Sequence, residues 1–272
     1  MSFTSTENKD LKIHIKQKTK MDKPLDAPYY TGKGKNKKLV TPTPLPNVLP
    51  NQSFLWLLIG PPRSGKSTYI ESLISAPDVK GIRQSYKGLF NKIIFFTPQI
   101  SDFENASFDE LEDVYSELNM ENLEEVEAIC QEEYDNGEQT LIIFDDMGAN
   151  FRKSAKVQTK LEEFTYNHRH MGVSIFFSAQ TYVSLSPGMR KSARLLTLFA
   201  MDTTMERERV MGDLPIKKDQ HDSLYNYVFE NDKNDKPDNK GKKRRHTLFI
   251  DKSKLRQPRI VYYKDFDLIS MK

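Results

Sequence analysis

Short, continuously apolar runs recur through the middle of the chain, separated by longer polar or amphipathic stretches. Runs of this length are too short for helices and are typical of strands covered on both faces of a parallel sheet. The stretches between them predict helices over about 65–75, 107–136 and 154–168. Strands that alternate with helices predict an α/β fold, a mostly parallel sheet flanked by helices with right-handed crossovers. The predicted strands are 54–59, 92–97, 141–144, 173–178 and 195–200.

The two ends of the chain lack this alternation. Residues 1–50 are polar and rich in Lys and, from 41 on, in Pro, which predicts a flexible basic arm. Residues 51–230 are expected to form the core, with 101–140 as an acidic helical insert. Residues 231–272 begin with a basic loop and end with two strand-like pieces, which are expected to pair as an edge hairpin. These two pieces are 247–250 and 259–263.

The net charge of +3 conceals an uneven distribution of charge. Residues 1–50 hold ten Lys against four acidic residues, whereas residues 101–140 hold fifteen acidic residues and neither Lys nor Arg. This asymmetry predicts a basic surface for an acidic partner. The acidic segment is expected to be a solvated helical face, the alternatives being a docking surface for a basic partner, such as a capsid protein, or a regulatory lid.

Cysteine content and hydropathy exclude several classes of protein. The single cysteine, Cys130, can form neither an internal disulfide nor a Cys-rich metal site, so we expect it to be a small buried apolar residue. The longest apolar run, 54–59, is far shorter than the roughly 20 residues of a membrane-spanning helix. We therefore expect an intracellular protein with no membrane partner.

The stretch after the first predicted strand matches the phosphate-binding pattern G-x-x-x-x-G-K-[ST] in full. Backbone N–H groups and the start of the following helix can cradle phosphate there, Lys66 can reach the β- and γ-oxygens, and Ser67 can ligate Mg²⁺. The motif therefore predicts ATP and Mg²⁺ as ligands in a P-loop fold. The residues expected at the nucleotide are Gly60, Pro61, Pro62, Arg63, Ser64, Gly65, Lys66, Ser67 and Thr68.

Two further strands end in polar side chains suited to ATP hydrolysis. Asp145 and Asp146 follow the apolar run 141–144, which is the Walker B pattern, so Asp145 is expected to hold Mg²⁺. Asp146 is expected to act as general base on water, the alternative being a cap for the following loop. Gln180 follows the run 173–178 and is expected to sense the γ-phosphate or to orient water, the alternative being an ordinary surface residue.

Taken together, these motifs resemble a known family. GPPRSGKS, LIIFDD, NHRHMGVSIFFSAQ and PGMRKSARLLTLF are similar to segments of the genome-packaging ATPases of large eukaryotic DNA viruses and their virophage relatives, in the FtsK/HerA superfamily. The resemblance covers about residues 54–212 and implies a RecA-like fold. A GTPase is excluded because no N-K-x-D motif is present. The sequence departs from cellular FtsK/HerA proteins at Asp146, where Glu is usual.

The resemblance implies ATP-driven translocation of double-stranded DNA into a preformed capsid by a ring of five or six identical subunits. It also implies a capsid or portal vertex as partner, and a location in the viral factory of the host cytoplasm or in the virion. The alternatives are another kind of P-loop ATPase, or a nucleotide-gated switch that binds DNA or capsid with little turnover.

Ring ATPases place an arginine of one subunit against the γ-phosphate of its neighbour. Arg169 is the first candidate for this role and Arg190 the second, and an ordinary surface arginine is the alternative for each. The basic run 240–245 and the Lys-rich arm are expected to contact DNA phosphates, unless they serve only as solubilising or nuclear-localisation segments.

Overall fold

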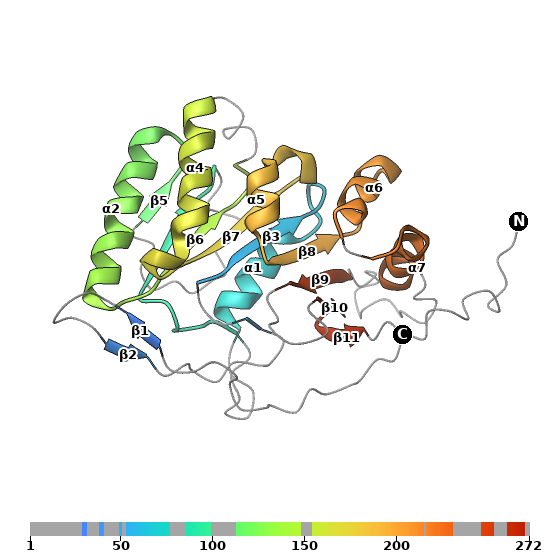
Figure 1. Cartoon of the computed structure of the whole chain (residues 1–272), viewed down its shortest axis with the longest axis horizontal. Helices are drawn as coiled ribbons and strands as arrows, with labels where there is room; N and C mark the ends of the chain where they lie inside the picture. The colour runs from blue at the N-terminus through green and yellow to red at the C-terminus, as the bar shows by residue number, and fades with distance from the viewer. Residues whose placement is uncertain are drawn as a thin grey trace, which may run out of the picture.

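A nine-stranded sheet lies at the centre of the computed structural model, in the order β11-β10-β9-β8-β3-β7-β6-β4-β5. The strands from β8 to β5 run parallel to one another, and β9, β10 and β11 continue the sheet antiparallel. The mostly parallel α/β fold that the sequence predicts is therefore confirmed (Figure 1). The described residues are 29–31, 38–40, 49–50, 53–76, 85–98, 113–147, 154–214, 216–230, 246–252 and 260–269.

All five predicted strands are present. They are β3 (Leu55–Ile59), β4 (Lys92–Phe96), β6 (Thr140–Phe144), β7 (Val173–Ala179) and β8 (Leu195–Phe199). Every residue of β3, β6, β7 and β8 is buried, as expected for strands covered on both faces. A separate antiparallel pair joins β1 (Tyr29–Thr31) to β2 (Lys38–Val40).

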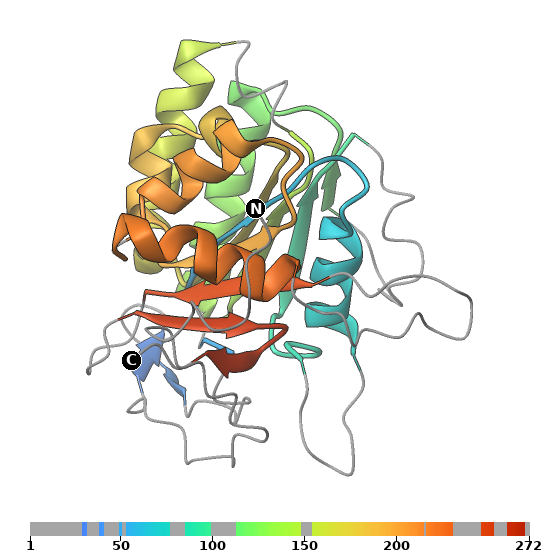
Figure 2. The same ribbon diagram turned by 90° about the vertical axis from the view of Figure 1, so that its right-hand side faces the viewer.

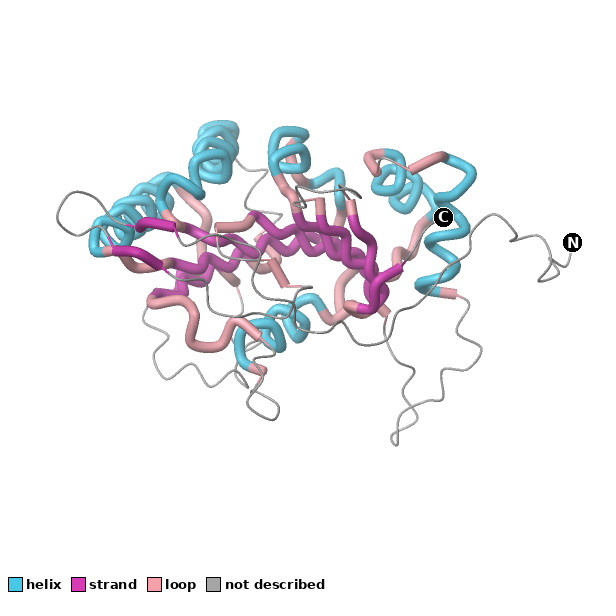
Figure 3. Tube along the Cα trace, turned by 60° about the horizontal axis from the view of Figure 1, so that its bottom comes forward, coloured by secondary structure: helices cyan, strands magenta, loops and turns pink. Residues whose placement is uncertain are grey.

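The helices divide unequally between the two faces of the sheet. Of the described helices, α1 (Lys66–Ser75) packs alone on one face of the sheet, where it contributes to one hydrophobic cluster. The other helices share a second hydrophobic cluster on the opposite face (Figures 1 and 3). This second group consists of α2 (Met120–Asn136), α4 (Ala155–Asn167), α5 (Pro187–Ser192), α6 (Thr204–Gly212) and α7 (Lys218–Phe229). Two short 3₁₀ turns, η3 (His168–Met171) and η4 (Tyr182–Ser184), flank β7.

The single helix predicted over 107–136 is wrong in its first part. Asp113–Tyr115 forms β5, which pairs in parallel with β4 at the edge of the sheet. The helix α2 begins only at Met120, because the Asn119 side chain caps it by accepting a hydrogen bond from the N–H of Asn122 at 2.8 Å. The short run at 113–115 contains a β-branched and an aromatic residue, which favour a strand over a helix. Residues 107–112, the first part of the predicted helix, lie outside the described residues.

The carboxyl-terminal strands pair as predicted but form more than a separate hairpin. β9 (Thr247–Asp251) pairs with β10 (Val261–Lys264), and it also pairs with β8, so these strands extend the central sheet. β11 (Asp267–Ile269) completes the edge (Figure 2). The predicted basic run 240–245 and most of the predicted basic arm lie outside the described residues. Within the described part of the chain, no helix is long and apolar enough to cross a bilayer.

Candidate nucleotide-binding site

The predicted phosphate loop and the acidic pair meet at one edge of the sheet. The loop leaves the carboxyl end of β3, and the neighbouring strands β7 and β6 end at Gln180 and at Asp145 and Asp146. In open parallel sheets, ligands bind in the crevice beyond these carboxyl ends. The strand order β3-β7-β6 therefore brings together residues that are more than 100 positions apart in the sequence.

The loop has the backbone shape that a phosphate cradle requires. Arg63 and Gly65 adopt left-handed conformations, with φ of 61° and 101°. A Cβ at Gly60 would lie 2.6 Å from Cβ of Phe199, so only glycine fits where the loop crosses β8. The helix α1 starts without a side-chain cap, which leaves its first N–H groups available to an anion.

Lys66 folds back over this loop. Its Nζ donates hydrogen bonds to the carbonyl oxygens of Gly60 at 2.8 Å and Pro61 at 3.0 Å. Burial lowers the pKa of Lys66, and the negative charges of Asp145 and Asp146 act against that shift. The ammonium is thus held at the centre of the loop, where it can exchange carbonyl oxygens for phosphate oxygens.

Asp145 is tied to the loop and to the neighbouring strand. Its Oδ2 accepts a hydrogen bond from Ser67 Oγ at 2.8 Å, and its Oδ1 accepts one from Ser178 Oγ. Burial raises the pKa of Asp145, while the two serine hydroxyls and Lys66 favour its charged form. The buried carboxylate and the Ser67 hydroxyl offer two adjacent hard oxygen ligands, which fits the preference of Mg²⁺ for oxygen. Among the described residues, no group of three His, Cys, Asp or Glu side chains forms a metal cluster, so phosphate oxygens and water would complete the coordination.

Asp146 has an unusual backbone and two hydrogen-bonded contacts. Its φ is 52°, a left-handed conformation that Asp tolerates better than most residues. Its N–H donates to Ser178 Oγ at 3.2 Å, and its Oδ1 accepts a hydrogen bond from Gln180 Nε2 at 2.7 Å. The carboxylate of Asp146 is exposed, in contrast to that of Asp145. The acid nearer to solvent is thus the one in contact with the Gln180 amide.

Ser178 is a site residue that the sequence reasoning missed. It lies fully buried in β7 and bonds both acidic residues, so it fixes one relative to the other. The available signal was a hydroxyl in an apolar strand, two positions before Gln180 and therefore on the same face. A buried hydroxyl requires a hydrogen-bond partner, and the end of the neighbouring strand β6 carries the carboxylates of Asp145 and Asp146.

The two candidate arginines lie on different elements and have different surroundings. Arg169 belongs to η3, which precedes β7, so it lies at the amino end of the sheet, opposite the phosphate loop. Burial lowers the pKa of Arg169, and the charge of Arg194 adds to this effect. Arg190 is held within the subunit, because its NH1 lies 3.2 Å from Asp213 Oδ2 and its guanidinium lies 4.9 Å from the ring centre of Tyr182.

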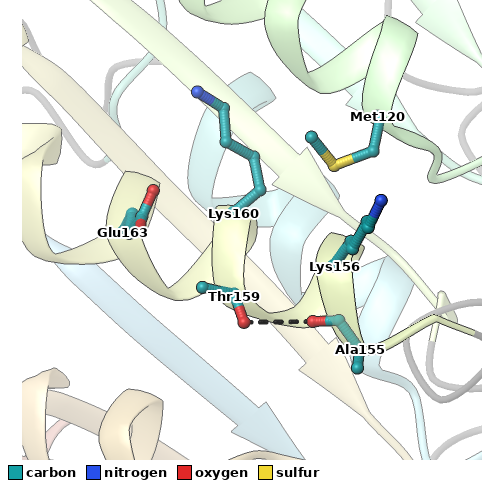
Figure 4. A pocket seen from close by; sticks show the side chains of 6 residues that line it. All are labelled: Met120, Ala155, Lys156, Thr159, Lys160 and Glu163. Atoms are coloured by element: carbon teal, nitrogen blue, oxygen red, sulfur yellow. Dashed lines mark hydrogen bonds between the residues drawn. The ribbon is translucent and has the colours of Figure 1, made fainter.

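A shallow groove elsewhere on the molecule contains none of these residues. It lies between α2 and α4 on the helical face (Figure 4). Lys160 of α4 forms an ion pair with Glu127 of α2. Thr159 Oγ1 donates to the carbonyl oxygen of Ala155 at 3.1 Å in its wall. Lys160 and Thr159 are thus bonded within the subunit. The lining residues are Met120, Ala155, Lys156, Thr159, Lys160 and Glu163.

Comparisons with known proteins agree with the motifs. The model of the Poxvirus A32 protein family matches residues 46–235. This match confirms the resemblance to the genome-packaging ATPases of large eukaryotic DNA viruses. No curated protein matches the chain at a significant level.

Several solved structures are similar to the chain at low identity. The DNA-packaging ATPase B204 from Sulfolobus turreted icosahedral virus is 18% identical, with a TM-score of 0.48 over 73% of this chain and 92% of that chain. B204 from Sulfolobus turreted icosahedral virus 2 in complex with ATP-gammaS is 22% identical, with a TM-score of 0.48 over 73% and 91%. EssC (ATPases 2 and 3) from Geobacillus thermodenitrificans is 10% identical, with a TM-score of 0.44 over 60% and 35%.

Proposed function

The chain belongs to the Poxvirus A32 protein family, and from that premise we propose that it is an ATP-driven translocase that moves double-stranded DNA into a preformed capsid. One observation carries the proposal. Hydrogen bonds join Ser67 to Asp145, and Gln180 to Asp146, at the same sheet edge as Lys66. This is the set of groups that phosphoryl transfer needs, since it combines phosphate positioning, a metal-binding pair and a group to orient water.

Each residue has a distinct role in this proposal. The loop amides and Lys66 bind and orient the phosphates. Ser67 and Asp145 would hold Mg²⁺, which would neutralise charge on the phosphate oxygens when bound. Ser178 keeps Asp145 and Asp146 in register by bonding both.

Asp146 is the proposed general base. Its Oδ1 accepts a hydrogen bond from Gln180 Nε2 at 2.7 Å. Gln180 uses one of the acceptor positions of Oδ1, and the other positions of the carboxylate can still accept a proton from water. We propose that the γ-phosphate draws the Gln180 amide to itself, so that ATP binding frees this position of Oδ1 as well.

Translocation requires more than one subunit, because a protomer of 272 residues cannot encircle duplex DNA. We propose a homo-oligomeric ring of five or six copies, in which each subunit supplies an arginine to the γ-phosphate bound by its neighbour. The basic run 240–245 and the Lys-rich arm are the proposed DNA contacts, and a capsid or portal vertex is the proposed docking partner. These roles place the protein in the viral factory of the host cytoplasm or in the virion.

The alternative is a switch that binds DNA or capsid and hydrolyses ATP only slowly. The Gln180–Asp146 hydrogen bond favours this candidate, because it occupies an acceptor position on Oδ1 of the proposed base. Steady-state ATPase rates with and without double-stranded DNA, at low and high salt, separate the two. A motor is expected to show salt-sensitive stimulation by DNA together with a ring-sized mass in light scattering. A monomer that binds ATP tightly and turns it over slowly, whether or not DNA is present, would contradict the motor and support the switch.

A further inference from the structure

The phosphate-binding helix α1 rests on a layer of aromatic side chains. Of the described helices, it alone covers its face of the sheet, so its support comes from strands and loops. Tyr69, two residues after Ser67, is edge-on to Phe199 at 5.8 Å and to Trp56 at 6.4 Å between ring centres. Phe199 in turn sets the space at Gly60, where a Cβ would meet it at 2.6 Å. Tyr69 thus links the start of α1 to the strand beneath the phosphate loop.

A residue from the far end of the chain closes this layer. Phe266, in the turn between β10 and β11, stacks on Tyr69 with ring centres 5.6 Å apart and an angle of 16° between the planes. Its ring also contacts Phe249 of β9, at 5.5 Å. The turn lies beyond residues 46–235, the part that the family model matches. The turn that carries Phe266 is therefore separate in sequence from the motifs that define the phosphate loop.

The turn is held firmly in place. Asp265 and Phe266 are both left-handed, with φ of 49° and 68°, and such conformations persist in non-glycine residues only where the surroundings fix them. The Asp265 carboxylate accepts hydrogen bonds from the N–H of Thr247 at 2.7 Å and its hydroxyl at 3.2 Å, and lies 2.6 Å from Nδ1 of His246. The N–H of Asp265 donates to the carbonyl oxygen of Thr247 at 3.1 Å. The backbone of β9 thereby fixes the position of Phe266.

We propose that Phe266 is a positioning residue for the nucleotide site. It holds Tyr69, and through Tyr69 the orientation in which α1 presents Lys66 and Ser67 to the phosphates. A displacement of Lys66 and Ser67 weakens their contacts with the phosphates, and contacts made equally in the ground and transition states act on KM rather than on kcat. The proposal rests on ATP binding at the phosphate loop, and it makes the carboxyl-terminal hairpin part of the ATP-responsive machinery.

The single tryptophan provides a readout. Trp56 is the only Trp in the chain, and its ring lies against Tyr69 and, stacked at 4.7 Å, against Phe249. If ATP binding shifts Tyr69, as the proposal requires, the fluorescence of Trp56 is expected to change. Phe266→Leu is expected to raise the Kd and KM for ATP about tenfold, to leave kcat within about twofold and to reduce the fluorescence change, because the lost phosphate contacts are made equally in the ground and transition states. Phe266→Tyr, which keeps the stacked ring, is expected to restore both.

Phe229→Leu is the matched control, because Phe229 packs against Tyr225 at 4.7 Å in the other cluster. An unchanged Kd and an unchanged fluorescence response in Phe266→Leu would overturn the proposal, as would equal losses in the Phe229 variant. If the unsubstituted protein itself does not bind ATP, the proposed function fails first and takes this proposal with it. If the Phe266→Leu variant does not fold, hydrogen exchange on the unsubstituted chain tests the proposal instead. ATP must then slow exchange in both α1 and 261–269, and protection confined to α1 would overturn the proposal.

Discussion

Asp146 allows a substitution that removes one function and little else. Asparagine tolerates a left-handed backbone as well as Asp does, and its side-chain oxygen can still accept the hydrogen bond from Gln180. Asp146→Asn is therefore expected to keep ATP affinity while turnover falls about 10²–10⁴-fold, the range for loss of a general base. Equilibrium ATP binding and single-turnover rates measure the two effects separately. Near-normal turnover in this variant would rule out Asp146 as the base.

Lys66 should show the opposite pattern. Lys66→Ala removes the ammonium from the centre of the loop, where it now bonds to Gly60 and Pro61, and so removes the main positive charge available to the phosphates. ATP binding is expected to become undetectable in calorimetry at concentrations that saturate the unsubstituted protein. Thermal unfolding without nucleotide serves as the control for folding. ATP affinity within a few-fold of the original would contradict the assigned role.

The residues of the site were predictable to different degrees. Lys66, Ser67 and the acidic pair follow from linear motifs whose spacing reflects the geometry of the bound phosphates. Ser178 belongs to no such motif, since its role depends on β7 lying beside β6, which only the folded sheet establishes. The contact between Phe266 and Tyr69 was likewise not predictable, because it joins segments almost 200 residues apart.

At the scale of elements, predictability followed burial. The strands β3, β4, β6, β7 and β8 carry a continuous apolar signal and were all predicted. β5 was not, because an edge strand of three residues leaves little pattern inside an acidic stretch. α6 buries only Val210 and Met211, so its apolar pattern is weak. Its one local signal was Thr203 followed by Glu206, where the Thr203 side chain accepts a hydrogen bond from the Glu206 N–H.

The junction between α4 and β7 contains a buried histidine with consequences for stability. Nδ1 of His168 donates to the carbonyl oxygen of Thr165 at 2.7 Å, and burial lowers the pKa of His168 to about 4, with Arg169 and Arg194 adding to the shift. Below pH 6.5, His168 binds a proton in the unfolded chain but stays neutral in the folded chain. The free energy of unfolding therefore decreases as pH falls from 6.5 towards 4.

His168 is expected to lower the free energy of unfolding by about 2 kcal/mol between pH 7 and pH 5, at roughly 1.4 kcal/mol per pH unit below 6.5. His168→Asn keeps an N–H donor at the same reach and cannot titrate. Urea unfolding at the two pH values should therefore show a smaller drop for this variant than for the unsubstituted protein. An equal drop in both would exclude His168 as the source of the pH dependence.

At the scale of the whole molecule, we propose from the position of Arg169 that a second copy completes the site. Arg169 lies before the first residue of β7 and the phosphate loop lies beyond the carboxyl ends of the strands, and seven residues of strand span about 23 Å. Arg169 therefore serves its own site poorly but can reach a neighbour whose phosphate loop faces this edge. Arg190 is less available, because Asp213 and Tyr182 already hold its guanidinium.

Mixed assemblies test this arrangement directly. Arg169→Ala alone is expected to bind ATP normally and to lose about 10³-fold or more in turnover, the lower end of the range for an arginine finger. Lys66→Ala alone cannot bind ATP but retains Arg169. In a mixture, the intact phosphate loop of the first variant meets the intact arginine of the second, so turnover should recover in proportion to the mixed interfaces. The Lys66→Ala substitution leaves Arg169 and the amino-terminal sheet edge around it unchanged. If light scattering shows that the two variants assemble together and activity still does not recover, Arg169 therefore does not act between subunits.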